Sequence, residues 1–248
     1  FIEVVMLEKP DVIAIQEVNQ TITAPLADTT LLIGFYPCLD ENTAKIRQNN
    51  HAAQVTNLLR SEGVSCSWTW ISFKIGYDEY DEGMALITIN HEITSVESFF
   101  ISKTHDYKNW KTRKVLGVQI SGCKDWFYTV HMGWWNDEEE PFSDQWKKLN
   151  TIINPKKNEK SNIWLMGDFN SPAELRNQGY DCIKESGWYD TYLLADVKDD
   201  GFTVKGSIDG WRSSSKETKS SVKDGMRIDQ IWCFNHVNVK SSKVVFNG

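Results

Sequence analysis

Four apolar segments of this 248-residue chain each lead into a polar side chain that could carry out chemistry. The segments are IAIQE at 13–17, YTVHMG at 128–133, IWLMGDFN at 163–170 and RIDQI at 227–231. Short apolar runs of this kind are typical of buried strands. Polar groups at strand ends can converge at one rim of a sheet, where ligands are commonly bound. We therefore expect the four segments to contribute to one functional site.

Asp168 and Asn170 lie in GDFNSP, directly after an apolar run that ends at Gly167. Alternate residues of an extended chain point to the same face, so the two side chains should project together. The carboxylate could orient or deprotonate an attacking water, and the amide could donate a hydrogen bond to a developing phosphorane oxygen. An Asx turn is the alternative interpretation, because Asp, Asn and Pro all favour turns.

Glu17 and His131 each follow an apolar run. The Glu17 carboxylate would be a good ligand for a hard cation such as Mg²⁺, which prefers oxygen and keeps several waters. A surface glutamate after a core strand would give the same pattern. A histidine such as His131 can protonate a leaving oxygen or stabilise a phosphate, and the alternative is a partly buried structural histidine.

Asp229 is a charged residue inside the otherwise apolar segment GMRIDQIW. Burying a carboxylate is unfavourable unless the charge is paired, so this position implies a cation or a histidine as partner. The alternative is a residue on an edge strand that faces water.

The elements that must position these groups are mostly strands. Residue patterns predict helices at 2–9, 43–61, 141–153 and 173–184, loops at 76–83 and 205–224, and strands at 12–15, 67–75, 84–89, 93–101, 114–120, 126–132, 163–166, 226–234 and 237–246. The chain shows no strict alternation of strand and helix and no internal repeat. This pattern predicts an α+β layered sandwich in a single domain, since no low-complexity linker divides the chain.

Composition and charge narrow the function classes. The net charge of −7 disfavours a non-specific nuclease, which would need a basic face to neutralise phosphates. The five cysteines form no CxxC pair, so a zinc site or a dithiol redox motif is not expected. The chain has no signal-peptide pattern and no apolar run of membrane-spanning length. We therefore expect a cytoplasmic protein with no membrane partner.

Taken together and in this order, QE at 16–17, the strand-end His131, GDFN and RIDQI resemble the endonuclease/exonuclease/phosphatase superfamily over nearly the whole chain. The resemblance implies a four-layered α/β/β/α sandwich of two mixed sheets flanked by helices, with 1–248 as one domain. It also implies metal-dependent hydrolysis of a phosphate ester, with Mg²⁺ or Mn²⁺ as the cofactor.

The resemblance assigns roles to several residues. Glu17 matches the metal-binding glutamate of the family, and Asp168 and Asn170 match its water-orienting and phosphate-binding pair. Asp229 matches an aspartate that orients a second, C-terminal histidine. That histidine belongs to an SDH-like motif, and the family pattern also has an earlier strand that ends in Asn. Neither is found in this sequence, so the expected domain lacks its first strand and its last motif.

Three further residues match the pattern of the superfamily. His131 matches the histidine found in its phosphatase, sphingomyelinase and deoxyribonuclease branches, and Glu82 in YDEGMALIT resembles the carboxylate that orients that histidine. Arg113 in KTRKVLGV resembles an arginine on a strand that faces the phosphate. The resemblance thus implies a phosphate-binding group around His131.

The segments at 131–146 and 76–86 resemble the maltose 6'-phosphate phosphatase branch. Trp134 and Trp135 directly follow His131, and their rings could pack against the apolar faces of a sugar. The acidic residues 137–140 could accept hydrogen bonds from hydroxyls and would repel a polyanion. Core packing of the tryptophans and a solvated helix start are the alternatives.

The expected function is a phosphomonoesterase whose partner is a small phosphorylated substrate, such as a sugar phosphate. Three other functions stay open: an endonuclease or exonuclease that cleaves DNA, a phosphodiesterase of lipid head groups, and a catalytically inactive binding module. Nucleic acid is a disfavoured partner because of the acidic balance of the chain.

Overall fold

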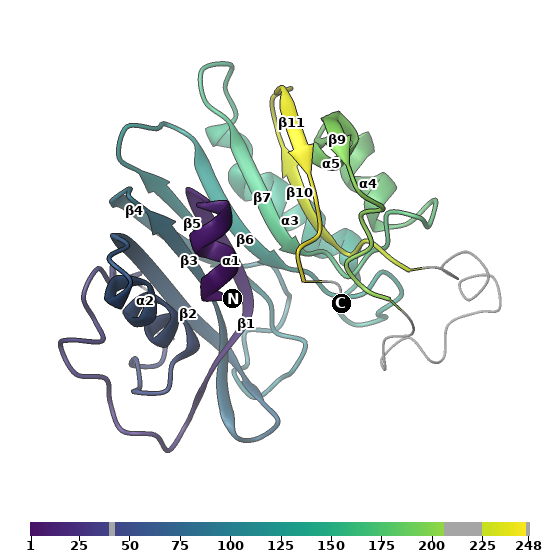
Figure 1. Cartoon of the computed structure of the whole chain (residues 1–248). Helices are drawn as coiled ribbons and strands as arrows, with labels where there is room; N and C mark the ends of the chain where they lie inside the picture. The colour runs from purple at the N-terminus through teal and green to yellow at the C-terminus, as the bar shows by residue number, and fades with distance from the viewer. Residues whose placement is uncertain (40–42, 206–224, 247–248) are drawn as a thin grey trace. The chain divides into compact units, whose positions relative to one another are not determined.

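A computed structural model describes residues 1–39, 43–205 and 225–246 of the chain (Figure 1). The chain divides into two compact units, Phe1–His131 and Met132–Gly248. Both contain strands and helices, and the sheets include antiparallel and parallel pairs. The fold class is therefore an α+β sandwich of mixed sheets flanked by helices, as the sequence predicts.

The first unit contains, in chain order, α1 (Ile2–Glu8), β1 (Val12–Thr21), α2 (His51–Ser61), β2 (Cys66–Gly76), β3 (Tyr80–Ile89), β4 (Ile93–Phe100), β5 (Lys114–Ile120) and β6 (Trp126–His131). Its strands form antiparallel arrays in the orders β1-β3-β2 and β4-β5-β6. The β1 strand lies against β6, and β3 lies against β5, so these arrays pack on each other. Between them, the Gln16 side-chain amide donates a hydrogen bond of 2.7 Å to the Thr129 hydroxyl.

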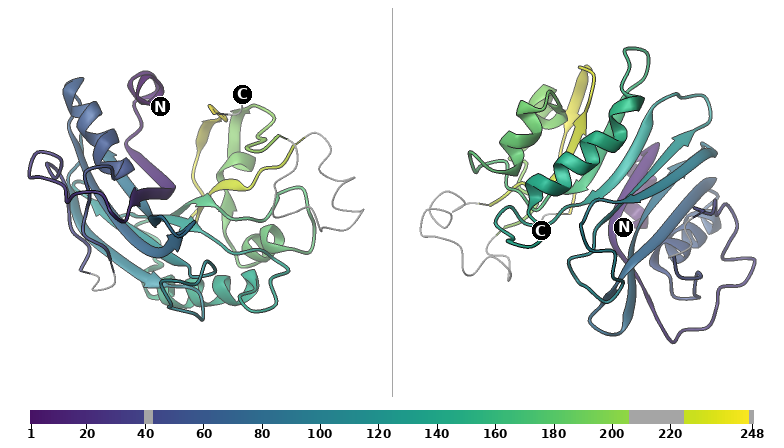
Figure 2. Two further views of the ribbon diagram at one scale, coloured as in Figure 1. Left: turned by 90° about the horizontal axis from the view of Figure 1, so that it is seen from below. Right: turned by 180° about the vertical axis from the view of Figure 1, so that it is seen from behind.

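Helix α2 covers one face of the β1-β3-β2 sheet, as the two views of Figure 2 show. The alternating residues Trp68 and Trp70 of β2 point to this face and are fully buried. They pack with Ala85 and Ile87 of β3 and with Leu59 of α2. Two of the eleven tryptophans thus fill this core, since an indole removes a large apolar area from water.

The second unit contains α3 (Phe142–Ile153), the 3-10 helix η1 (Asn154–Lys156), β7 (Ile163–Asp168), α4 (Gly179–Glu185), β8 (Tyr189–Asp190), α5 (Thr191–Leu194), β9 (Ala195–Lys198), β10 (Asp229–Cys233) and β11 (Val239–Ser242). The β10 strand pairs antiparallel with β7 and with β8, and β11 pairs parallel with β9. Helix α3 buries Phe142, Trp146, Leu149 and Ile153, whose spacing places them on one helical face.

Two of the predicted elements differ from the structure for local reasons. The predicted helix at 43–61 begins only at His51, because the Asn50 side chain accepts the backbone N–H of Ala53 and caps the helix there. The predicted loop at 76–83 is a tight β-hairpin. Tyr77 and Asp78, with positive φ angles of 52° and 56°, form its turn, and β3 begins at Tyr80.

Further differences lie in the second unit. The predicted helix at 173–184 begins only at Gly179, and the sequence patterns did not indicate β8, α5 or β9. Most of the predicted loop at 205–224 lies outside the described residues. The structure confirms, to within one residue at each end, the predicted strands at 114–120 and 126–132 and the predicted helix at 141–153.

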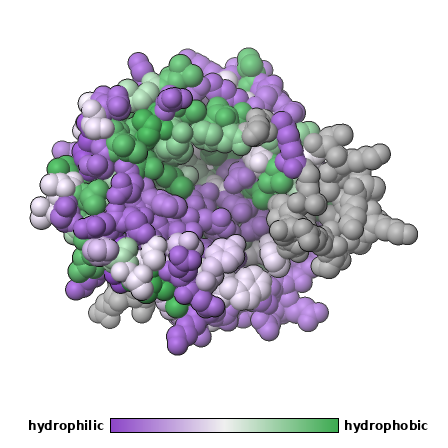
Figure 3. Space-filling view, turned by 60° about the horizontal axis from the view of Figure 1, so that its bottom comes forward, coloured by the Kyte–Doolittle hydropathy of each residue, from purple (hydrophilic) through white to green (hydrophobic). Residues whose placement is uncertain are grey.

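The surface carries both hydrophilic and hydrophobic residues, which lie side by side on the face shown in Figure 3. Among the exposed large hydrophobic residues are Leu7 at 77% and Tyr77 at 91% of full exposure. None of the helices in the described part of the chain is long and apolar enough to cross a membrane. The five cysteines are all free thiols.

Candidate functional site

Glu17 lies at an irregularity in the middle of β1. The register between β1 and β3 shifts between Ile15 and Val18, and Glu17 has a positive φ of 53°. A β-bulge of this kind inserts a residue into one strand and redirects a side chain. The prediction that the strand ends at Glu17 is therefore wrong, because β1 continues to Thr21 and the bulge leaves the carboxylate exposed.

Three side chains from three strands of the first unit meet at one place. Glu17 of β1, Glu82 of β3 and His131 of β6 each offer a ligand atom, and these atoms lie within 4.8 Å of one another. Glu82 and His131 are buried, whereas Glu17 is exposed. Carboxylate oxygens suit hard cations, and imidazole suits the transition metals. The cluster is thus a possible metal-binding group built from residues distant in sequence.

A buried lysine accompanies this cluster. Lys74 lies opposite Glu82 in the β2–β3 register, and its ammonium is 2.8 Å from the Glu82 carboxylate. Burial, and next the charge of Arg113, lower the pKa of Lys74, while Glu82 acts in the opposite direction. Sequence reasoning missed Lys74. The available signal was a single charge inside the apolar segment SFKIG, the same signal that indicated Asp229.

Arg113, which was expected to face a phosphate, is buried in the first unit. Its guanidinium donates to the backbone carbonyls of Trp110 (2.8 Å) and Thr112 (3.1 Å). Burial, followed by the positive charges of Arg113 and Lys74, holds the pKa of His131 well below its ordinary value. These effects favour the neutral form of the His131 imidazole. Its environment favours hydrogen bonding or metal ligation over donation of a proton from an imidazolium.

In the second unit, two carboxylates face each other across a strand pair. Asp168 of β7 lies directly opposite Asp229 of β10, and such partners project from the same face of a sheet. Asp229 is exposed to solvent on one side, but the protein around its carboxylate displaces part of the water, and this desolvation raises the pKa of Asp229. A hydrogen bond from Thr203 acts in the opposite direction. Asp168 also accepts the backbone N–H of Asn170 at 2.7 Å. The Asx turn left open by the sequence is thus present within the GDFN segment.

The side-chain amide of Asn170 is held on both sides. Its nitrogen donates to the Met132 carbonyl at 2.9 Å, and its oxygen accepts the indole N–H of Trp134 at 3.2 Å. The ring of Trp135 packs against Phe142 of α3, with the ring centroids 6.1 Å apart. Trp134 thus contacts the predicted site directly, whereas Trp135 shows the packing contact that was the alternative interpretation.

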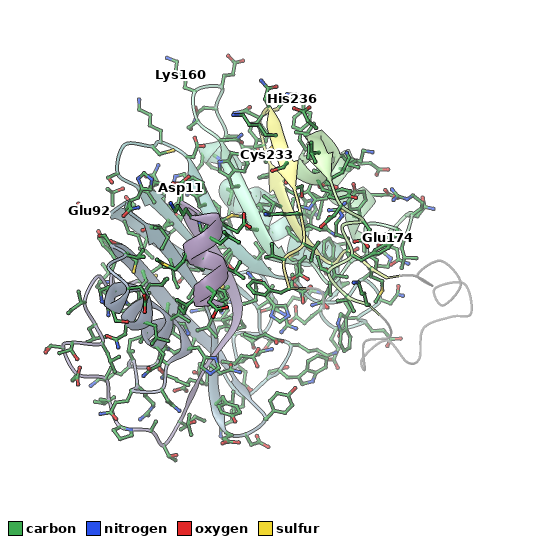
Figure 4. The ribbon with its side chains drawn as sticks, viewed as in Figure 1. Asp11, Glu92, Lys160, Glu174, Cys233 and His236 are labelled. Carbon is green, nitrogen blue, oxygen red and sulfur yellow. The ribbon has the colours of Figure 1, made fainter. Side chains whose placement is uncertain are left out.

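A buried ion pair supports the RIDQI segment, and sequence reasoning missed it. The Arg227 guanidinium donates to both oxygens of Asp190, at 2.6 and 3.3 Å, and the Tyr180 hydroxyl donates to the same carboxylate at 2.7 Å. The backbone N–H of Arg227 also donates to the carboxylate of Glu174, which Figure 4 labels. Asp190 and Tyr180 are 37 and 47 positions away from Arg227, so no local pattern links them.

The GDFN loop is joined to the same segment by backbone hydrogen bonds. The N–H of Phe169 donates to the Ile228 carbonyl at 2.9 Å, and the N–H of Ala173 donates to the Arg227 carbonyl at 3.1 Å. These bonds hold the chain on both sides of Asn170 against the strand that carries Asp229.

The fold is similar to that of several solved structures. An endonuclease/exonuclease/phosphatase family protein from Leptotrichia buccalis is 30% identical, with a TM-score of 0.77 over 99% of this chain and 84% of that chain. Similar structures from Beutenbergia cavernae (13% identity, TM-score 0.57, 94% and 57% covered) and Bacteroides vulgatus (17% identity, TM-score 0.55, 98% and 80% covered) carry the same family description. No protein-family model and no curated protein matches the sequence.

The chain belongs to the endonuclease/exonuclease/phosphatase family, as the order of its motifs predicted. The proteins of this family are hydrolases of phosphate esters, and this membership makes the chain a phosphoester hydrolase.

Proposed function

We propose that the protein is a divalent-metal-dependent phosphomonoesterase that hydrolyses a phosphorylated sugar. The observation that supports it most strongly is the cluster of Glu17, Glu82 and His131, whose ligand atoms lie within 4.8 Å of one another. These residues come from three strands and occupy positions that match the motifs of the family. Such convergence of carboxylates and an imidazole on β-strands is what a metal-assisted hydrolase requires.

The two carboxylates of the cluster suit a hard, hydrated cation. Mg²⁺ prefers oxygen ligands and usually keeps several of its waters. Glu82 is already paired with Lys74, so Glu17, which is exposed at its bulge, is the residue that would hold the ion directly. When bound there, Mg²⁺ or Mn²⁺ would supply Lewis-acid stabilisation of charge on a phosphate oxygen.

The charges around the cluster suggest how an ion and a phosphate would bind together. The negative charges of Glu17 and Glu82 are matched by the positive charges of Lys74 and Arg113, which act on this group. A divalent cation would therefore meet little net attraction from the protein alone. A phosphate dianion would add the missing negative charge, so we expect metal and phosphate to enhance each other's binding.

The other residues would act on the water and on the phosphoryl oxygens. Asp168 would orient and deprotonate the attacking water, with Asp229 opposite it on the neighbouring strand. Asn170, His131 and Arg113 would donate hydrogen bonds to the phosphoryl oxygens as negative charge develops there. The order of the motifs along the chain is the basis for assigning both groups of residues to one reaction.

A sugar phosphate fits better than a nucleic acid for reasons of charge. The protein carries a net charge of −7, and Glu138 and Glu139 are exposed just after the two tryptophans. These carboxylates would repel a polyanion, whereas they could accept hydrogen bonds from hydroxyls. Asp137 is used locally, because it accepts the backbone N–H groups of Glu139 (2.9 Å) and Glu140 (2.8 Å).

A substrate panel tests this proposal. Sugar phosphates including maltose 6'-phosphate, nucleotides, a phosphocholine diester and duplex DNA would be incubated with Mg²⁺, Mn²⁺ or a chelator, and released phosphate or fragments measured. We expect phosphate release from sugar phosphates only when metal is present. DNA cleavage that falls steeply with salt would instead support a nuclease. Failure to hydrolyse any phosphate ester with either metal would contradict the proposal.

A pair of variants tests whether Glu17 and Asp168 serve one reaction. Glu17→Gln and Asp168→Asn would each lower kcat by about 10²–10³, as removal of a key catalytic group commonly does. Residues that act as a unit are not additive, so the double variant should be no slower than the slower single variant. Losses that multiply in the double variant would show that the two residues act independently.

A further inference from the structure

We propose that Trp134 is a positioning residue whose indole N–H sets the orientation of the Asn170 side-chain amide. This inference rests on the proposed function, in which the Asn170 amide donates to a phosphoryl oxygen. It gives Trp134 a role that differs from stacking on a sugar ring.

The two contacts of the amide select one of its two orientations. An indole N–H can only donate a hydrogen bond, so the group facing Trp134 must be the amide oxygen, which lies 3.2 Å from the indole nitrogen. A backbone carbonyl can only accept, so the group facing Met132 must be the NH₂, at 2.9 Å. The second hydrogen of that NH₂ group is then the one directed to a substrate oxygen.

Burial makes this selection strong. Asn170 is 7% exposed, so water has little access to compensate a misplaced amide. In the flipped orientation, the amide oxygen would face the Met132 carbonyl and the NH₂ would face the indole N–H of Trp134. The flip would break both hydrogen bonds. The contact between the Asn170 amide and the Met132 carbonyl is buried, and an unmade hydrogen bond there is costly.

The segment that carries Trp134 is itself anchored to α3. The backbone N–H of Gly133 donates to the side chain of Gln145 at 2.8 Å, and that side chain donates to the Glu140 carbonyl at 3.0 Å. A Cβ atom at Gly133 would lie 2.6 Å from the Gln145 amide nitrogen, so a side chain there would disturb this contact. A positioning group needs such support to hold its partner within a narrow range of geometry.

The backbone of Asn170 is held by a separate contact. Its φ is +46°, and its N–H donates to the Asp168 carboxylate at 2.7 Å. Asp168 thus sets where the residue lies, and Trp134 sets which way its amide points. The indole of Trp134 would therefore affect the rate of the chemical step more than the binding of substrate.

A double-mutant cycle tests the inference by activity. Trp134→Phe keeps the aromatic ring and removes the N–H, and we expect kcat to fall about tenfold with KM changed by less than about twofold. Asn170→Ala should lower kcat by about 10²–10³. In the Asn170→Ala background, Trp134→Phe should have no further effect on kcat. An equal loss from Trp134→Phe in both backgrounds would overturn the inference, because a general structural role does not depend on Asn170.

Trp146→Phe is the matched control. It removes an indole N–H on α3 of the same unit, which donates to the Ser186 hydroxyl at 2.9 Å and not to Asn170. This variant should keep the wild-type kcat even if its melting temperature falls. A loss of kcat in Trp146→Phe equal to that in Trp134→Phe would show that any weakened tryptophan contact slows the enzyme, and would overturn the inference.

A second measurement does not depend on activity. The indole N–H signal of Trp134 in an NMR spectrum can be identified by its absence from Trp134→Phe. We expect Asn170→Ala to shift this signal and to speed its exchange with solvent, while the Trp146 signal stays unchanged. An unaltered Trp134 signal would overturn the inference whatever the enzyme hydrolyses. An altered signal in a protein that hydrolyses no phosphate ester would instead uphold the contact and contradict the proposed function.

Discussion

Replacing Glu82 by Gln would remove one charge of a buried ion pair and leave the other in place. The Lys74 ammonium lies 2.8 Å from the Glu82 carboxylate, and both side chains are only 8% exposed. Removing one partner of a buried pair costs about 3–5 kcal/mol, because the remaining charge stays in a poorly solvated environment. For a chain of 150–250 residues, a loss of that size lowers the melting temperature by roughly 6–20 °C.

The loss of stability should depend on pH in a defined direction. Burial already lowers the pKa of Lys74, and Glu82 opposes that effect, so the pKa should fall further in Glu82→Gln. A lysine whose pKa is lower in the folded than in the unfolded state binds fewer protons when folded, so stability rises with pH. The stability deficit of the variant is therefore fully present below the folded pKa of Lys74 and shrinks as pH rises toward about 10.4.

Urea unfolding followed by circular dichroism between pH 7 and pH 10 would measure this effect. Glu79→Gln, at an exposed position in the turn between β2 and β3, is the control and should stay within about 0.5 kcal/mol of wild type. Adding Lys74→Met to Glu82→Gln removes both charges and should recover much of the lost stability. A Glu82→Gln variant as stable as the control at every pH would refute the reasoning.

Three further changes should have measurable effects. Asp190→Asn leaves the buried Arg227 guanidinium without its carboxylate and should cost about 3–5 kcal/mol in urea unfolding, whereas an effect below 1 kcal/mol would contradict the role of this pair. The pKa of His131 is lower in the folded than in the unfolded state, so the free energy of unfolding should decrease as pH falls below about 6.5. In His131→Gln, which does not titrate, urea unfolding should show a weaker decrease over the same pH range. Calorimetric titration should show tighter Mg²⁺ binding with phosphate present than without it, and Glu17→Gln should abolish both signals; binding unchanged by that variant would place the ion elsewhere.

Local patterns in the sequence predicted much of the fold. The alternation in SWTWISFKI follows directly from the two faces of a strand, and the apolar spacing at 141–153 follows from one buried helical face. For the GDFN segment, the structure shows the Asx turn that the sequence left open as the alternative interpretation. In each case the deciding interactions are between residues close together in the chain.

The parts that could not be predicted depend on contacts between distant residues or on backbone geometry. The bulge at Glu17 arises from its pairing with β3, some 65 positions further along the chain, and not from the local apolar run. The pairing of Lys74 with Glu82 depends on a tight turn that polar residues alone did not reveal. Asp190 lies at the end of β8 and Arg227 precedes β10, 37 positions further along, so only the folded chain brings their charges together.

The most direct test of the catalytic account is the rate of phosphate release by Asp168→Asn, measured with saturating Mg²⁺ on a phosphomonoester that the wild type hydrolyses. The asparagine oxygen can still accept the backbone N–H of Asn170, so the turn and the melting temperature should be preserved. Loss of the base should lower kcat by about 10²–10³. A folded Asp168→Asn protein that releases phosphate at a rate near that of wild type would contradict the account.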